Sequence, residues 1–533
     1  MGTGFFRVEV FTGNHALPIA NDRVLIKSTD GNILYDLVTD ENGITEEVPL
    51  TAPDKEFSRQ PFTSMPRFSV VDVEVPAMYG YKRAVVHWAE IFDTITTTLP
   101  MQLHPIIEGG SEEENTDEYF IPIEHGVDMQ RGIQAGGSAD DPPGDRNAIP
   151  SQRPNNNTIL PVQDSLIDPP APANDIPMPE YITVHLGSPS AYARNVTIPF
   201  ADYIKNVASS EIYPTWDEEA IYANIYAQIS FALNRMFTLW YRSRGLNFDI
   251  TNSTAFDQYF IEGRCIFDNI SQIVDKIFNN FIRRPGRLEP FFASYCNGTT
   301  STCAGLSQWG AQYMAQQGHS AIQILRNYYP DDVQIVESNN FEEHTALYPG
   351  TPLKEGSTGE DVRLMQFFLN RIHGNYPGIP ATVPDGIFGP ATRTSVETFQ
   401  SVFRLIADGI VGKSTWYAII KTYVSVTKLA ELTSEGLRIG IGAAPPTTTI
   451  RLGSQGELVA ELQFLLNYIS LFYNEVPPVL RTSRFGEETQ TSVMEFQKNF
   501  GLTADGIVGP GTWQKLYTVY HSIQDTVQVA LTE

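Results

Sequence analysis

The C-terminal third of this 533-residue chain carries one residue pattern written twice, 97 positions apart (Gly359 to Gly456). The first copy places its glycine, glutamine, threonine and aromatic residues at Gly359, Gln366, Gly389, Thr392, Phe399, Gln400, Asp408, Gly409, Gly412, Thr415 and Trp416. The same residue types return at Gly456, Gln463, Gly486, Thr489, Phe496, Gln497, Asp505, Gly506, Gly509, Thr512 and Trp513. The repeat predicts two copies of one small docking unit.

Each copy predicts three helices. Apolar residues in the first helix recur at i, i+3, i+7 and i+10, which is typical of one buried stripe. These residues are Val362, Met365, Leu369 and Ile372, and then Val459, Leu462, Leu466 and Ile469. The second helix is expected to start at Pro390, because a missing N–H costs nothing at the first helical position. The third helix follows an Asp-Gly turn and carries Trp416 or Trp513, which we interpret as core residues.

The repeated pattern resembles the peptidoglycan-binding domain of cell-wall hydrolases. The residues that carry the resemblance read G…LQ..L…FG..T…V..FQ…L..DGIVG..TW, and they predict one domain over 348–425 and another over 446–520. The resemblance implies that glycan strands of peptidoglycan are the partner. The contact surface would then lie between the helices.

Composition limits the other partners. The chain has a formal net charge of −26 and 42% hydrophobic residues, so we expect several globular cores. Clusters of Lys and Arg that would bind phosphate are lacking, which argues against nucleic acid and anionic membranes. The sequence contains no apolar run of 18 residues and no basic-then-apolar start, so we expect no membrane span and no secretory signal.

The front of the chain predicts an antiparallel β-sandwich over 1–104. Apolar and polar residues alternate in short runs such as Phe6-Val8-Val10 and Val71-Val73-Val75, with turn residues between them. The stretch PIANDRVLI…VTDENGITEEVPL resembles the carboxypeptidase-regulatory type of Ig-like domain. Residues 105–178 are acidic and rich in proline, and we expect them to form a mobile linker that proteases can cut.

The strongest candidate for catalysis lies in the middle of the chain. Glu211 stands in a turn flanked by Tyr213 and Trp216. A carboxyl group among aromatic rings loses hydration, which raises its pKa toward that of a general acid. Thr215 and Glu218 have capping-box spacing, and they predict a long helix that runs to about Tyr241.

Residues 179–340 resemble the stage II sporulation protein D family of peptidoglycan lytic transglycosylases. The resemblance is carried by SSEIYPTWDEEAIYA, FFASYCNGTT and GLSQWGAQYMAQQGHSAIQILRNYY. It implies that Glu211 is catalytic and that Ser307 and Gln308 line the substrate groove, with Tyr213 and Trp216 as further groove candidates. The chain departs from the family where an Arg-Thr pair is expected and Ile229 and Ser230 stand instead.

One carboxyl group suffices for a lytic transglycosylase. It protonates the leaving glycosidic oxygen and then, as a carboxylate, takes the proton of the sugar's own 6-hydroxyl, which closes a 1,6-anhydro ring. Ordinary glycosidases use two carboxyl groups. The other acidic residues fit different roles: helix N-terminal charge for Asp217, Glu218 and Glu219, and turns or caps for Asp249 and Asp257.

The chain has three cysteines. Cys265 is interpreted as a core residue, while Cys296 and Cys303 are compatible with a disulfide or with two buried thiols. Zinc at Cys296 and Cys303 is an alternative that the resemblance raises, but structural zinc sites normally have four N/S ligands and no histidine lies between these two. We expect no other cofactor.

The order of parts also resembles the clostridial spore cortex-lytic enzymes of the SleC type. The sequence therefore predicts a multidomain α+β protein with an Ig-like sandwich, a sporulation-protein-D-like domain and two three-helix modules. The resemblance implies a spore or cell-wall location and a propeptide released by a subtilisin-like protease. Two alternatives stay open: a non-catalytic wall-binding or spore structural protein, and an enhancer of a separate amidase.

Overall fold

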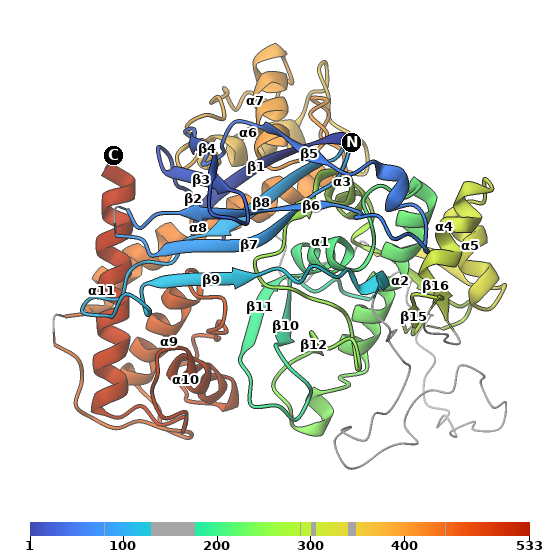
Figure 1. The fold of residues 1–533 in the computed structure, drawn as a ribbon. Coiled ribbons are helices and arrows are strands. Elements are labelled where there is room, and N and C mark those ends of the chain that lie inside the picture. Colours follow the sequence, from blue (N-terminus) through green and yellow to red (C-terminus); the bar gives the residue numbers. More distant parts are fainter. Residues whose placement is uncertain are drawn as a thin grey trace, which may run out of the picture.

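The computed structural model describes residues 1–78, 80–128, 176–287, 289–299, 305–338, 348–442 and 444–532. Within them lie an N-terminal domain (1–128), a middle domain (176–338), a first module (348–442) and a second module (444–532). Figure 1 shows the blue N-terminal strands lying between the green helices of the middle domain and the orange and red helices of the two modules.

The N-terminal domain is built from two β-sheets that enclose one core. The first sheet contains β1 (Gly2–Thr12), β2 (Leu17–Pro18), β5 (Val48–Ala52) and β8 (Thr96–Gln102). The second has the order β4 (Ile33–Val38), β3 (Arg23–Lys27), β6 (Ser69–Val75), β7 (Arg83–Ile91) and β9 (Thr116–Phe120). The predicted alternation is confirmed, because Phe6, Val8 and Val10 are fully buried in the shared core.

A strand of the middle domain extends the first sheet. β13 (Ile266–Phe267) pairs with β8 in antiparallel register, Ile266 opposite Thr98 and Phe267 opposite Thr97. The neighbouring Cys265 is fully buried in the N-terminal core, as the prediction of a core thiol requires. Main-chain hydrogen bonds therefore join the two domains.

The prediction of a linker from residue 105 onward needs correction for 105–128. This segment contains β9, which pairs in parallel with β7, and the 3-10 turn Gly126–Asp128. Ile121 and Val127 are fully buried, and Asp117 of the acidic run lies 2.7 Å from His104. Two residues of the acidic run, Asp117 and Glu118, are thus strand residues that form ion pairs with histidines. The rest of the predicted linker up to residue 175 lies outside the described residues.

The middle domain surrounds one buried helix. Its helices are α1 (Phe200–Glu211), α2 (Glu218–Phe237), α3 (Asp268–Ile277), α4 (Gln308–Gln316) and α5 (Ala321–Tyr328). Its strands are β10 (Tyr181–His185), β11 (Asn195–Pro199), β12 (Ile250–Thr251), β14 (Asn280–Arg283), β15 (Tyr295–Cys296), β16 (Leu306–Ser307) and β17 (Gln334–Glu337). Most residues of α2 are buried, since this helix packs against α1, α4, α5 and β14.

Both predicted ends of α2 differ in the structure. Asp217 occupies the N-cap position, whereas the Thr215 hydroxyl lies 2.6 Å from the Ser58 hydroxyl of the N-terminal domain. The expected capping box is therefore wrong, because Thr215 is used for a contact between domains. The helix ends at Phe237, and Glu218 and Glu219 lie in its first turn as expected.

The two modules are helical as predicted. They consist of α6 (Glu360–His373), α7 (Pro390–Val402) and α8 (Lys413–Ile439), followed by α9 (Glu457–Ser470), α10 (Glu487–Asn499) and α11 (Pro510–Thr532). All eight residues of the predicted first-helix stripes have no exposed surface. Pro390 opens α7, and Trp416 and Trp513 are buried in the two cores.

The repeated glutamines explain much of the repeated pattern. Gln366 donates from Nε2 to Asp385 Oδ1 (3.1 Å) and to Thr392 Oγ1 (3.0 Å), and its Oε1 accepts the N–H of Gly386 (3.0 Å). Gln400 makes the same set of bonds around the turn at Asp408. Each glutamine thus fixes a tight turn from inside the core, which requires a glutamine, a glycine and a threonine at set spacings.

One helix joins the two modules. The sequence predicts that the first module ends near residue 425, but α8 runs on to Ile439. Its Leu429 and Leu432 are buried in the core of the second module, and a methyl group on Gly436 would lie 3.0 Å from Phe464. The connection between the modules is therefore a packed helix.

Both modules hold the N-terminal domain through equivalent tyrosines. The Tyr376 hydroxyl donates to the carbonyl of His15 (2.6 Å), and the Tyr473 hydroxyl donates to the carbonyl of Pro105 (2.9 Å). These tyrosines stand 97 positions apart, in the same register as the repeat. The N-terminal domain thus contacts the middle domain and both modules.

Candidate active site

Glu211, the predicted catalytic residue, is the last residue of α1. Its side chain is buried, with 2% of the residue exposed. The chain leaves the helix at Ile212, which has extended backbone angles, and continues into the turn that leads to α2. The carboxyl group therefore lies at a junction between two buried helices.

Neutral donors surround the Glu211 carboxyl group. The Gln228 side chain on α2 donates to Oε2 (2.8 Å), and the main-chain N–H of Tyr259 donates to Oε1 (2.9 Å). The Tyr295 hydroxyl also bonds to the carboxyl group. Burial raises the pKa of Glu211 to about 7, although these three hydrogen bonds act in the opposite direction. The group is thus balanced between its acid and base forms near neutral pH.

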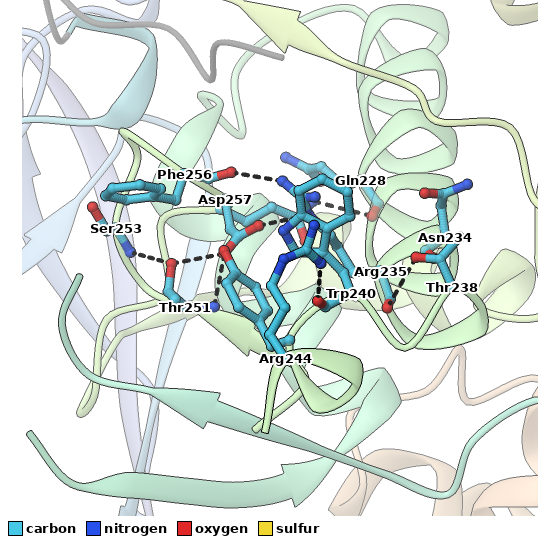
Figure 2. Close-up of polar contacts among 12 residues, drawn as sticks. Gln228, Asn234, Arg235, Thr238, Trp240, Arg244, Thr251, Ser253, Phe256 and Asp257 are labelled. Atoms are coloured by element: carbon cyan, nitrogen blue, oxygen red, sulfur yellow. Dashed lines mark hydrogen bonds and ion pairs between the residues drawn. The ribbon is translucent and has the colours of Figure 1, made fainter. Parts of the chain in front are cut away.

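A buried ion pair anchors the segment that holds Glu211. Asp257 has no exposed surface, and it accepts from Arg235 Nε (2.8 Å) and from the N–H of Thr251 (3.0 Å). Figure 2 shows this pair beside Trp240, whose ring lies 4.5 Å from the Arg235 guanidinium. Because Asp257 is fixed, the N–H of Tyr259 two residues later is fixed as well.

The expected turn or cap roles of Asp249 and Asp257 are therefore wrong. Asp249 is also buried and pairs with Arg242, and it accepts the N–H of Thr183 at 2.9 Å. Both aspartates are anchors for loops. Their arginine partners could not be assigned from the sequence, because each arginine and its aspartate lie on different elements that only the tertiary fold brings together.

Three aromatic residues form one buried cluster at the turn that follows Glu211. Tyr213, Trp216 and Trp309 are all buried, and the two indole rings have centroids 4.8 Å apart. The Tyr213 ring lies 6.1 Å from each of them. The predicted groove residues Tyr213 and Trp216 are thus brought together with the tryptophan of the SQWGA segment.

Ser307 and Gln308 lie at the start of α4, and their roles in a groove stay predictions. The Ser307 hydroxyl accepts the N–H of Gly310 (3.0 Å) as the N-cap of α4, and it also bonds to Tyr328. Gln308 begins α4 and is 3% exposed, directly before Trp309. The structure therefore uses Ser307 to start the helix that delivers Trp309.

Residues of the N-terminal domain cover Glu211 and Tyr213. A methyl group on Gly126 would lie 3.1 Å from Cγ of Glu211. The adjacent Asp128 accepts from the Tyr213 hydroxyl and pairs with Arg67 at 2.7 Å. Glu211 consequently lies in a closed site, whose cover comes from the segment directly before residue 129.

A second set of contacts holds the N-terminal domain against the same part of the middle domain. The indole N–H of Trp216 donates to the carbonyl of Ser58 (3.0 Å), and Arg59 pairs with Asp217 (2.7 Å). Ser230 stands on α2 where the sporulation protein D pattern would have a threonine. Its hydroxyl accepts the N–H of Ile282 at 2.8 Å. Ser230 therefore serves packing within the middle domain.

A buried charge cluster lies beside the residues that cover Glu211. The sequence did not predict this cluster. Arg264 donates to both oxygens of Glu90 on β7 (3.0 and 2.8 Å), and His125 lies 2.6 Å from the same carboxylate. All three side chains have no exposed surface. Burial alone would raise the pKa of Glu90, but the charges of Arg264 and His125 outweigh it and hold the pKa below its usual value.

The cysteines and the metal question can be treated together. Cys296 is disulfide-bonded, and Cys303 lies outside the described residues. Burial raises the pKa of the Cys265 thiol to about 12. Within the described parts of the chain, no group of three or more His, Cys, Asp or Glu side chains could hold a metal ion.

The comparison with protein families decides the nature of the modules. Residues 358–419 and 455–516 match the family described as "Putative peptidoglycan binding domain". The chain carries two peptidoglycan-binding domains. Their matched ranges enclose the glutamine-fixed turns and the buried tryptophans, so the predicted resemblance is confirmed for both modules. No described helix is long and apolar enough to cross a bilayer.

Three curated relatives carry the names of a carboxypeptidase, an amidase and a spore cortex-lytic enzyme. The zinc D-Ala-D-Ala carboxypeptidase of Streptomyces albus G is 50% identical over 68 residues, 13% of this chain and 25% of that protein. The N-acetylmuramoyl-L-alanine amidase CwlM of Mycobacterium tuberculosis is 30% identical over 133 residues, 25% and 27% of the two chains. The spore cortex-lytic enzyme of Halalkalibacterium halodurans is 36% identical over 84 residues, 16% and 24%.

These matches are partial. The chain spans only about a quarter of the length of these three relatives. The assignment of the middle domain to the sporulation protein D family and the role of Glu211 stay predictions.

Proposed function

We propose that the protein is the precursor of a peptidoglycan lytic transglycosylase, with Glu211 as its acid and base. The observation that carries this proposal is the environment of Glu211: its hydrogen bonds from the described residues all come from neutral groups of the middle domain, and burial raises its pKa to about 7 in the uncut chain. A group of this kind holds a proton near neutral pH and can also release it, as general acid–base catalysis requires. The two peptidoglycan-binding domains would keep the substrate close.

The proposed reaction has two proton transfers. Protonated Glu211 gives its proton to the glycosidic oxygen as the bond between the sugars breaks. The resulting carboxylate takes the proton of the muramic acid 6-hydroxyl, whose oxygen bonds to the anomeric carbon and forms the 1,6-anhydro product. Gln228 and the N–H of Tyr259 hold the carboxylate form in place between the two transfers.

In the uncut chain this reaction would be blocked. Gly126 and Asp128 lie over Glu211 and Tyr213, so a sugar ring cannot reach the carboxyl group. We expect that a cut within 129–175, by a subtilisin-like protease in the cell, would allow the N-terminal domain to leave. The spore cortex or the cell wall would be the place of action.

The test is digestion of purified cortex and vegetative peptidoglycan by the full-length chain, cut at a specific protease site introduced within 129–175. We expect 1,6-anhydro-muramic ends by mass spectrometry, and their loss in Glu211→Gln and in the uncut chain. Glu262→Gln is a matched control, because burial also raises the pKa of Glu262 to about 7, while this residue pairs with Arg194 in a separate cluster. Loss of activity in both variants would contradict the assignment.

A second function has an observation in its favour. The family's Arg-Thr pair is replaced by Ile229 and Ser230, which are both buried in packing contacts. A middle domain without catalysis would leave a wall-binding structural protein or an enhancer of an amidase. Tight wall binding with unchanged muropeptides would establish the structural role, and amide cleavage only after addition of a separate amidase would establish the enhancer.

A further inference from the structure

We propose that Arg264 binds a carboxylate of the peptidoglycan substrate, and that Glu90 occupies this carboxylate position in the uncut chain. The inference rests on the proposed function, because the position becomes accessible only after the N-terminal domain has left. The ligand chemistry is a carboxylate, which peptidoglycan offers on the muramic lactyl group when the peptide is absent and on the stem peptide when it is present.

The partners of Arg264 come from two parts of the chain. Its anionic partner Glu90 and the neighbouring His125 both belong to the N-terminal domain. In the middle domain, Arg264 Nε donates to the carbonyl oxygen of Ser209 at 3.0 Å. When residues 1–128 leave, Arg264 keeps its neutral acceptor and loses its only described carboxylate partner.

Arg264 is also bonded to the helix that carries Glu211. Ser209, which orients the guanidinium, precedes Glu211 by two residues on α1. The same short segment covers both groups, since His125 contacts Arg264 and Gly126 contacts Glu211. Departure of this segment would therefore uncover a fixed cation and the proposed acid together.

The geometry of the Glu90 contact is that of a carboxylate site. Two guanidinium nitrogens of Arg264 donate to two carboxylate oxygens, which is the fork-to-fork arrangement that makes arginine selective for carboxylates. The ring of Phe267 lies 5.7 Å from the guanidinium and supports it from one side.

A purely adhesive role makes a different prediction. If Arg264 serves only to hold the two domains together, its replacement would weaken their docking and leave ligand binding by the cut chain unchanged. If it binds substrate, the cut chain must distinguish a carboxylate from a neutral group of the same shape. The decisive readout is therefore ligand discrimination.

The test uses the cut full-length chain carrying Glu211→Gln, so that bound probes are not consumed. The probes are the N-acetylglucosaminyl-N-acetylmuramic acid disaccharide with a free lactyl carboxylate, the same disaccharide with a stem peptide whose carboxylates are free, and the methylamide derivative of each. Calorimetry is expected to show tighter binding of at least one carboxylate probe than of its methylamide, on the order of tenfold. The comparison of the two carboxylate probes identifies the source of the carboxylate.

The same difference is expected to vanish in Arg264→Gln, to persist in part in Arg264→Lys, and to be absent from the uncut chain. The comparison of probes with Arg264 intact does not depend on the folding of either variant. Equal binding of carboxylates and methylamides, no binding of any probe, or discrimination that survives in Arg264→Gln would overturn the proposal. Failure of the proposed function would instead appear as missing anhydro products when Glu211 is intact.

Discussion

Glu211 and Glu90 are both buried carboxylates, yet their surroundings differ in one respect. Glu211 is bonded to an amide side chain, a main-chain N–H and a hydroxyl, whereas Glu90 is bonded to an arginine and a histidine. Burial raises the pKa of Glu211 to about 7, while the charged partners of Glu90 overcome the same effect of burial. The comparison teaches that the charge of the partners, rather than burial, separates a group suited to proton transfer from one suited to adhesion.

The glutamines of the two modules extend this comparison to a polar group that cannot ionise. Gln366 and Gln463 are buried to the same extent as Glu211, and their amide groups bond on both sides to turns and threonines. They stabilise the fold and offer no proton. A buried polar residue with neutral partners is therefore structural unless it can titrate near neutral pH.

The largest effect is expected from breaking the Glu90 pair. Glu90→Gln leaves Arg264 buried without its anion, which should lower the free energy of unfolding of the uncut chain by about 3–5 kcal/mol. Urea unfolding measures the change. Asp36→Asn is the control, because its pair with Arg23 is about half exposed and exposed ion pairs contribute little to stability. Equal effects of the two substitutions would contradict the comparison.

The pH dependence of stability should separate the two glutamates next. The pKa of Glu211 is about 7 in the folded chain against an ordinary value of 4.5, so between these values the folded state keeps a proton that the unfolded state has lost. The contribution of Glu211 to the free energy of unfolding therefore falls as the pH rises from about 4.5 to about 7, by about 3 kcal/mol at most.

Urea unfolding of Glu211→Gln and of the parent at pH 4.5, 6 and 8 would show this. The variant should gain relative stability with rising pH and then level off above about pH 7. Glu90→Gln should behave differently, since the pKa of Glu90 is lowered below its ordinary value of 4.5: the deficit is nearly constant from pH 4.5 to 8 and shrinks only when the series is extended below pH 4.5, toward the folded pKa. Parallel pH profiles for the two variants would show that the difference between their partners is unimportant.

A smaller effect is expected from the glutamines. Gln366→Ala leaves the N–H of Gly386 and the Thr392 hydroxyl without their buried partner, at a cost of about 1–3 kcal/mol. Gln463→Ala should cost less, because the residue that replaces Asp385 in the second module is the neutral Thr482. Urea unfolding of each variant measures the two losses of stability, with Gln514→Ala at an exposed position as the control.

The smallest effect concerns the turn that differs between the modules. Ser483 has a φ of +55° where the first module has Gly386 with a φ of +76°. Ser483→Gly should raise the free energy of unfolding by up to about 1 kcal/mol, since a side chain in this region is strained, and Gly386→Ser should lower it. A loss of stability in Ser483→Gly, measured by thermal unfolding, would mean that the serine side chain compensates for its backbone.

The sequence predicted the modules well because their pattern is local. Helical periodicity, an Asp-Gly turn and a proline at the helix start each act within a few residues, and the repeat gives every position an internal control. Arg404 illustrates the limit: it has a φ of +60° where the second module has Gly501, and its guanidinium lies 3.3 Å from Glu9 of the N-terminal domain. No local rule predicts an arginine there.

The candidate site could be predicted only in part for the same reason. Glu211 and its aromatic neighbours lie close in sequence, so their common burial followed from composition. The donors Gln228 and Tyr259, the anchor Asp257 and the cover at Gly126 come from distant segments, and only the tertiary fold brings them to the carboxyl group. The segment 105–128 was mistaken for a linker because an acidic strand that pairs with basic neighbours looks like a solvated run.

The packed helix α8 fixes the spacing between the two peptidoglycan-binding domains. Its 27 residues span about 40 Å at the usual helical rise, and its last turns are locked into the second unit's core. Two domains held at a fixed spacing cannot adjust to binding positions at arbitrary distances along a polymer. A lattice whose binding positions recur at the matching interval would hold both ends at once and gain avidity, while an irregular one would hold a single end. The fixed spacing of the two domains would therefore favour peptidoglycan whose binding positions recur at a regular interval.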